Sequence, residues 1–175
     1  MGLLDQLFGR PALAASVTHE AISVAPGPTT AHQAWAHARP RAEAFDAKAR
    51  LVLVTSGTDL RPDGRSSRWE FLFELPSRQA TLLASLAPPD DGDPDTAPAR
   101  LTLRVQPAPG RAPGPALPSR FRDSPDVVAE FAANGVDFVA GPSDMKLEAR
   151  VLGAGPAWIT WTWDGERHAA FSLDS

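Results

Sequence analysis

Residues 69–86 read WEFLFELPSRQATLLASL, and this stretch decides how the chain folds. Its first seven residues place large apolar side chains at every second position, which is typical of a strand with one buried face. The sequence Pro76-Ser77-Arg78 then interrupts the pattern, and residues 79–86 are again rich in apolar side chains. The stretch therefore predicts two antiparallel strands joined by a tight turn.

A second stretch near the end of the chain has a similar pattern. Residues 158–173 align with residues 69–84 without a gap, so that Trp158 is matched with Trp69. We therefore predict an α+β fold of two similar units, each a helix packed on antiparallel strands, sharing one compact core. The predicted units span residues 29–107 and 123–175, with a short N-terminal helix and linker over 1–28 and a proline-rich connector over 108–122.

Composition limits the class of protein. The chain has 175 residues, of which 43% are hydrophobic and 22% charged, so it can bury an ordinary core. Its net charge of -4 does not favour non-specific binding of nucleic acid, and no such partner is expected. The chain has no cysteine, which excludes disulfides, zinc–thiolate sites and a thiol nucleophile.

Targeting signals are not evident in the sequence. Residues 1–10 lack the basic region and the long apolar run of a signal peptide, and no stretch approaches the ~18 consecutive apolar residues of a membrane helix. We therefore expect no transmembrane segment and a cytoplasmic location.

The first predicted helix begins after Thr29 or Thr30, either of which is suited to cap it. One apolar face follows at spacings of three and four residues, through Ala31, Trp35, Ala38, Ala42 and Phe45. Pro40 lies inside this helix and removes one backbone hydrogen bond, so we predict a kink or a restart there.

The second predicted helix begins near residue 124. Ser124 is the predicted N-cap, Pro125 suits the first helical position, and Asn134-Gly135 supplies a left-handed stop. Further strands are predicted over residues 14–24, 51–54, 101–105 and 145–152.

The order of elements, a helix and then antiparallel strands in each half, resembles that of PepSY-like domains. The resemblance is carried by the alanine-spaced helix, by residues 45–51 (FDAKARL) and 69–73 (WEFLF), and in the second half by Trp158 and Leu173-Asp174. It covers residues 30–174 as a tandem. It implies a small helix-on-sheet module and, because the family is associated with protease propeptides, an inhibitory or binding role.

Candidate catalytic and metal-binding residues are few. His32 and His37 are five residues apart, so on a helix they diverge by about 140° and cannot share a metal ion. No phosphate-binding, dinucleotide-binding or nucleophile-elbow motif is present. We therefore expect no catalytic residue, no cofactor and no metal, and we predict that the protein is not an enzyme.

One acidic stretch resembles the start of a calcium loop. Asp91, Asp93 and Asp95 have the right spacing, but Thr96 stands where the loop needs glycine and Thr102 where it needs a bidentate glutamate. A solvated acidic loop is the preferred interpretation.

Residues 158–163 (WITWTW) give the one candidate surface. Trp158 lies on one face of the predicted strand, and Ile159, Trp161 and Trp163 lie on the other. Either a one-residue bulge shifts the register or both faces are apolar, in which case something must cover the second face. The N-terminal residues 1–10 are one candidate cover, and a protein partner, a homodimer or a ligand is the other.

The favoured hypothesis is therefore a non-catalytic binding or interaction module of unknown ligand, with Ile159, Trp161 and Trp163 as its candidate surface. The alternatives are a protease-associated inhibitor or chaperone-like protein, which the family resemblance implies, and an enzyme of unknown class that uses carboxylates.

Overall fold

The computed structural model describes the backbone of residues 16–19, 24, 27–110, 112, 114–138, 146–153, 155–161 and 167–172, and the side chains of all of these except 16–19, 161 and 167–172. The elements are β1 Ser16–His19, α2 Ala31–Phe45, β2 Arg50–Ser56, β3 Trp69–Leu75, the short 3-10 helix η1 Pro76–Arg78, β4 Ala80–Ala87, β5 Arg100–Pro107, α3 Ser124–Ala133, β6 Lys146–Leu152, β7 Gly155–Trp161 and β8 Arg167–Ser172.

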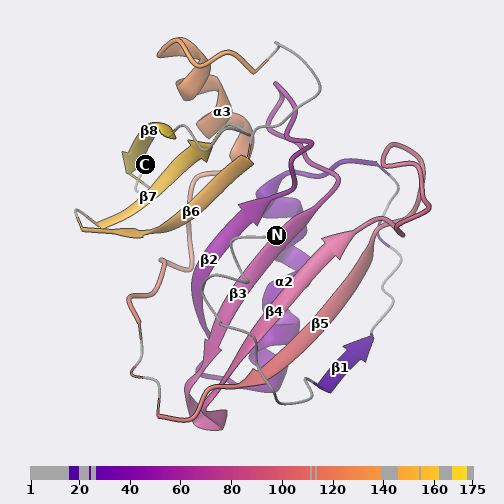
Figure 1. Ribbon diagram of the computed structural model, residues 1–175, viewed down its shortest axis with the longest axis vertical. Coiled ribbons are helices and arrows are strands. Elements are labelled where there is room, and N and C mark those ends of the chain that lie inside the picture. Colours follow the sequence, from indigo (N-terminus) through magenta and orange to yellow (C-terminus); the bar gives the residue numbers. More distant parts are fainter. Residues whose placement is uncertain are drawn as a thin grey trace.

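The strands form one sheet in the order β1-β5-β4-β3-β2-β6-β7-β8 (Figure 1). Every neighbouring pair in it is antiparallel. The prediction of an α+β fold with antiparallel strands is confirmed, as is the hairpin of residues 69–86, whose turn is η1. In chain order, β2 to β5 run outward on one side of the β2–β6 pair, and β6 to β8 run outward on the other.

Helix α2 lies against one face of this sheet, behind β3 and β4 in Figure 1. The side chains that it buries there are small, namely Ala31, Ala34, Ala38 and Ala42. Small residues allow the helix axis to approach the sheet closely, so that the bulk of the core is supplied by the strands instead.

The ends and the middle of α2 follow from its sequence. Thr30 is the N-cap and forms a capping box with Gln33: the Gln33 amide donates to Thr30 Oγ1 at 3.3 Å, and the Thr30 amide donates to Gln33 Oε1 at 2.9 Å. The helix continues through Pro40, so the predicted restart does not occur. Pro40 and Ala36, whose carbonyl loses its usual donor, are both exposed, and water can reach that carbonyl.

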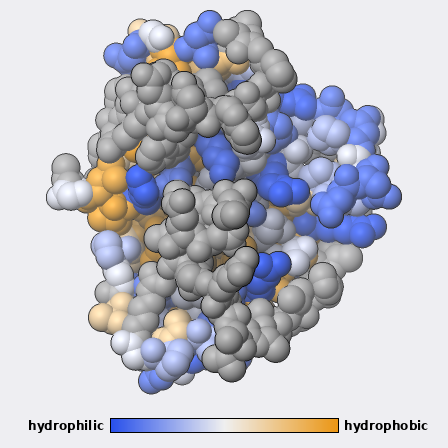
Figure 2. Space-filling model, in the orientation of Figure 1, coloured by the Kyte–Doolittle hydropathy of each residue, from blue (hydrophilic) through white to orange (hydrophobic). Residues whose placement is uncertain are grey.

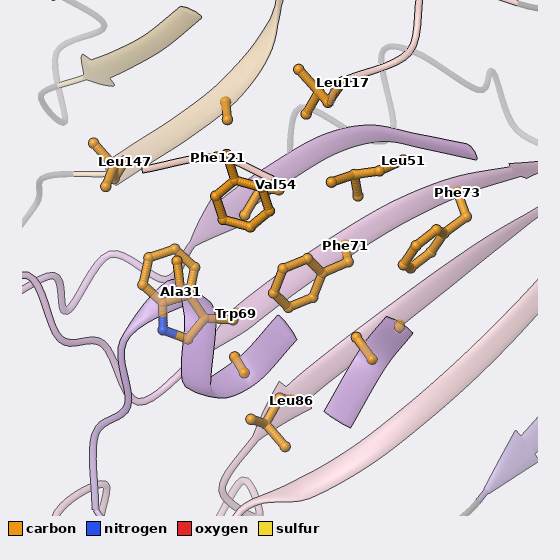
Figure 3. Close-up of a cluster of buried hydrophobic side chains, with 14 of the residues drawn as sticks. Ala31, Leu51, Val54, Trp69, Phe71, Phe73, Leu86, Leu117, Phe121 and Leu147 are labelled. Carbon is orange, nitrogen blue, oxygen red and sulfur yellow. The ribbon is translucent and has the colours of Figure 1, made fainter. Parts of the chain in front are cut away.

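Aromatic side chains of β3 form the centre of the core (Figure 3). Trp69, Phe71 and Phe73 lie along the strand on the side that faces α2, and all three are buried. Full burial of side chains of this size contributes a large apolar area to the core. The Trp69 indole Nε1 also donates to the Thr29 carbonyl at 2.9 Å, which ties the strand to the start of α2.

The proline-rich segment after β5 does more than connect. Its Leu117 and Phe121 are buried in the same cluster as the β3 aromatics, and Trp158 of β7 belongs to that cluster too. The Leu117 amide donates to the Leu51 carbonyl at 2.7 Å, on β2. The composition of this segment indicated a connector, but alternation is lost among its prolines and these two core positions gave no sequence signal.

The start of α3 differs from the prediction. Asp123, not Ser124, is the N-cap, and its side chain accepts from the Ser124 amide at 2.9 Å. Ser124 instead reaches the other helix, where its Oγ accepts from the Ala31 amide at 2.9 Å. Asp123 Oδ1 accepts from the His32 amide at 2.8 Å, so the beginning of α3 caps the beginning of α2.

The hairpin registers do not follow the gapless match of the two halves. Trp69 is paired with Leu86 across β3 and β4, and the match therefore places residue 175 opposite Trp158. The observed partner of Trp158 is Phe171. The second hairpin is paired four positions closer to its turn, and its register also shifts between Ile159 and Trp161. A bulge of this kind was one of the two predicted alternatives.

Candidate binding site

The face of the sheet away from α2, called here the far face, carries an unexpected set of buried polar residues. One row of directly paired positions crosses it through Thr102, Ser85, Glu70, Thr55 and Glu148. Alternation predicted a polar face for β3, because side chains alternate along a strand. Thr55 and Glu148, at the β2–β6 end of the row, are nevertheless buried.

A pocket lies at the end of the β3–β4 hairpin, where the chain leaving β5 passes beside η1 (Figure 1). Its volume is about 360 Å³. Gln79 adopts a left-handed conformation with φ of 47° after η1, and its carbonyl accepts from the Ala108 amide at 2.7 Å. This bond holds the segment after β5 against the hairpin and so fixes one wall of the pocket. The lining residues are Glu74, Leu75, Pro76, Gln79, Ala80, Thr81, Ala108, Gly110 and Ala112.

Glu74 is the ionisable side chain among these described lining residues. It lies opposite Arg50 on β2 and Thr81 on β4, and only 6% of its surface is exposed. Its Oε1 accepts from the Gly114 amide at 2.9 Å, while the Gly114 carbonyl accepts from Arg50 Nη2 at 2.8 Å. The two peptide groups that flank Gly114 are therefore held by an acid and a base from neighbouring strands.

The second carboxylate oxygen of Glu74 lacks a hydrogen bond from the described residues. Oε2 is buried and has no hydrogen-bond partner among the described residues. A buried acceptor without a donor is costly, and more so when it belongs to a carboxylate. Close packing at Gly114 supports the arrangement, because a Cβ added there would lie 3.2 Å from Glu74 Oε1.

A second cavity, of about 260 Å³, lies along α2 on the helix side of the sheet. Trp35 stacks on Phe73 in its wall, with ring centroids 5.6 Å apart and an angle of 13° between planes. Arg39 and Glu43 line it too, and they are joined by an ion pair of 2.7 Å between Nε and Oε1. Arg39 and Glu43 thus already bind one another.

Glu148 is the other buried acid of the far face. Burial raises the pKa of its carboxyl above the ordinary value of 4.5, and the charges of Arg150 and Lys146 on the same strand counteract part of that rise. Arg150 Nε lies 3.1 Å from Glu148 Oε1. Glu148 lines neither of the two cavities described above.

The residues of the predicted surface are only partly described. Ile159 is fully buried at 0% exposure, directly opposite Glu148, so it is not part of an exposed patch here. The backbone of Trp161 belongs to β7, but its side chain lies outside the described residues, as does all of Trp163. Residues 1–10, the predicted cover, also lie outside them.

Asp93, in the acidic stretch that resembles the start of a calcium loop, is hydrogen-bonded to its own neighbours. Asp93 accepts from the Asp95 amide at 2.9 Å and from the Thr96 hydroxyl at 3.0 Å, which closes the acidic turn on itself. Figure 2 shows hydrophilic residues gathered over this loop between β4 and β5, at the right of the view. Within the described ranges, no group of three or more His, Asp or Glu side chains is placed to hold a metal ion.

The sequence does not mark Glu74 as a site residue, because its position in β3 alternates with the core residues and so indicates an exposed side chain. The signal that buries it lies in the segment after β5, whose path over the hairpin cannot be read from prolines and glycines alone.

Comparison of the chain with protein-family models, with curated proteins and with solved structures found no match. In the part of the chain that the structure describes, neither helix has the length and apolar character needed to cross a membrane.

Proposed function

We propose that this chain is a non-catalytic binding module and that the pocket at the end of the β3–β4 hairpin is its ligand site. The observation that carries the proposal is a cavity of about 360 Å³ bordered by a buried carboxylate with one oxygen lacking a donor. Small-molecule sites are typically concave and mostly apolar, with a few polar groups that fix orientation. Leu75, Pro76 and Ala108 with Glu74 and Thr81 fit that description.

Binding is favoured over catalysis by the chemistry of the wall. Nucleophiles are usually activated by an adjacent base, and acid–base sites commonly pair two titratable groups. Among the described lining residues, Glu74 has no such titratable neighbour in the pocket. An enzyme that uses carboxylates is therefore the weaker alternative.

We further propose that the module consists of two similar units that meet at the β2–β6 pair. The sheet order supports this, because each half is a helix followed by strands that run outward from the centre. A role as a protease-associated inhibitor or chaperone-like protein follows only from the resemblance to PepSY-like domains and predicts slower cleavage by a peptidase in the presence of the chain.

The ligand site is tested by screening a mixed fragment library against the isotope-labelled protein by amide NMR. We expect some fragments to shift the amides of Gln79, Ala80, Thr81 and Ala108, and to leave that of Thr160 unchanged. Ala108→Leu, which fills the pocket, should abolish these shifts.

The matched control is Ala116→Leu, whose position lines the second cavity, and it should preserve the shifts. If fragments of every charge class leave the pocket amides unmoved, the proposed function is wrong. Chemical conversion of a bound fragment would favour the enzyme instead.

A further inference from the structure

We infer that the hairpin pocket takes an organic cation, an ammonium or guanidinium group on a short apolar stem, with its head against Glu74. This inference rests on the proposed function and names the class of its ligand. The first step is the bonding capacity of Glu74. Oε1 is used by the Gly114 amide at 2.9 Å, and Oε2 has no donor among the described residues. Oε2 has almost no accessible surface in this structure, so a ligand that reaches it must shift the pocket wall slightly and must supply a donor.

Charge decides which donor is preferred. A hydrogen bond from a cationic donor to a carboxylate is about twice as strong as one between neutral groups. It also compensates the removal of the carboxylate from water, since only 6% of the Glu74 surface is exposed. An anionic ligand would meet an acid in the pocket wall and is disfavoured for the same reason.

Arg50 does not replace such a ligand. It lies opposite Glu74, but its Nη2 donates to the Gly114 carbonyl at 2.8 Å. Arg50 binds the Gly114 carbonyl and Glu74 binds the Gly114 amide. The second contact uses Oε1 of Glu74, so Oε2 remains without a donor among the described residues. The pair therefore positions the segment after β5 and keeps the carboxylate in place for a ligand.

The rest of the wall suits an apolar stem. Leu75, Pro76, Ala80 and Ala108 border the cavity, and the Thr81 side chain lies on the same face as Glu74, directly across the hairpin. A stem of about four carbons with a compact head fits well within a volume of about 360 Å³. Both a free amine and the basic side chain of a peptide have this chemistry.

The test is a titration of the full chain, followed through the pocket amides, with n-butylammonium, 1-butanol and butyrate as probes of equal length. We expect n-butylammonium to bind at least about tenfold more tightly than 1-butanol, and butyrate not to bind. Equal affinity for the ammonium and the alcohol, or preference for butyrate, would overturn the inference. In that event the pocket would still bind fragments, so the proposed function would stand while its ligand class failed.

Substitutions test whether the cation contacts Glu74. Glu74→Gln keeps an acceptor for the Gly114 amide but removes the charge, and it should weaken n-butylammonium about ten- to hundredfold. Glu70→Gln, the same change four residues away on the same face of β3, should leave the affinity within about twofold. Equal losses in the two variants would contradict the inference. If Glu74→Gln fails to fold, Thr81→Val should still weaken the cation and spare the binding of neutral fragments.

Two peptides distinguish a basic side chain of a protein partner from a free amine as the natural ligand. The peptides acetyl-Gly-Lys-Gly-amide and acetyl-Gly-norleucine-Gly-amide differ only in the cationic head. Binding of the lysine peptide more tightly than n-butylammonium assigns a protein partner, and the reverse assigns a free amine; both support the inference. Arg111 falls between two lining residues in sequence and is outside the described part of the chain. If cations bind only after Arg111→Ala, the chain supplies its own cation and the inference is overturned.

Discussion

Asp46 and Glu148 are buried to nearly the same degree, with 6% and 3% of their surfaces exposed, yet their pKa values shift in opposite directions. Burial raises the pKa of both carboxyls. At Asp46 it is outweighed by hydrogen bonds from the Lys48 amide at 2.9 Å and the Ser77 amide at 2.7 Å, so the net pKa is lowered. At Glu148 no amide of the described residues lowers the pKa in this way, and nearby positive charges do not reverse the rise. The two amide donors thus account for the lowered pKa of Asp46, and burial without such a donor accounts for the raised pKa of Glu148.

The same contrast separates the two buried tryptophans. Trp69 Nε1 donates to the Thr29 carbonyl at 2.9 Å, whereas Trp158 Nε1 has no partner among the described residues. Both rings are fully buried. The hairpin and helix of the first half therefore satisfy their buried polar atoms more fully than β6 and β7 do. Glu74 Oε2 is the exception among the described residues of the first half, and Glu74 lines the pocket.

The largest expected change in stability is for Trp69, at the centre of the first half. Trp69→Ala should lower the free energy of unfolding by about 3–5 kcal/mol, because it leaves a large cavity beside Phe71 and removes the bond to Thr29. Chemical denaturation measures this change. A loss below about 1 kcal/mol would mean that the core does not depend on this ring.

Asp46→Ala should cost about 1.5–3 kcal/mol at neutral pH, the usual worth of a hydrogen bond to a charged group. Because the folded pKa is lowered, this stability is present above the ordinary value of 3.8 and is lost as pH falls through the folded pKa. The deficit of the variant should therefore shrink in acid. Asp63→Ala, at an exposed turn, is the control and should change stability by less than about 0.5 kcal/mol. If the variant is destabilised by the same amount in acid, the amide hydrogen bonds do not act through the charge of Asp46, and its contrast with Glu148 fails.

The tryptophans can be compared by the same small substitution. Trp69→Phe breaks a buried hydrogen bond, whereas Trp158→Phe removes an indole nitrogen that has no partner among the described residues. We expect the first to be more destabilising by about 1 kcal/mol in denaturant unfolding. Equal costs would show that the Trp158 indole N–H has an acceptor outside the described residues.

The smallest effect at low pH is expected for Glu148→Gln. A raised folded pKa means that the native state prefers the protonated acid, so the wild-type carboxyl costs nothing below its unfolded pKa and destabilises the fold as pH rises above about 4.5. The variant should therefore match the wild type in acid and become relatively more stable as pH increases. Thermal unfolding between pH 4 and 8 measures the slope, and a slope of the opposite sign would mean that Arg150 dominates.

Much of the fold follows from periodicity. The β3–β4 hairpin was predicted because Trp69, Phe71 and Phe73 alternate, and α2 was predicted from its alanine face and threonine cap. The gapless match of the halves was wrong about the register of the second hairpin, because pairing depends on turn length and bulges that a sequence match does not encode.

The candidate site was not predictable in the same way. Glu74 has the pattern of a solvent-facing strand residue, and only the backbone of Gly114 and the wall supplied by Ala108 make it a buried acid beside a pocket. Contacts between irregular backbone and a strand leave no periodic signal. Of the predicted surface, Ile159 is buried, and the roles of Trp161 and Trp163 stay predictions.

The caps between the two helices have a consequence for how the chain is made. The first amides of α2, at Ala31 and His32, find their acceptors in Ser124 and Asp123, which follow 93 and 91 residues later. During synthesis from the N-terminus, α2 and its hairpin emerge before those acceptors exist. The first turn of α2 is then completed only late, by contacts of long sequence separation, and such contacts slow folding. The start of α3, which is made about 90 residues after the start of α2, thus completes the first turn of α2.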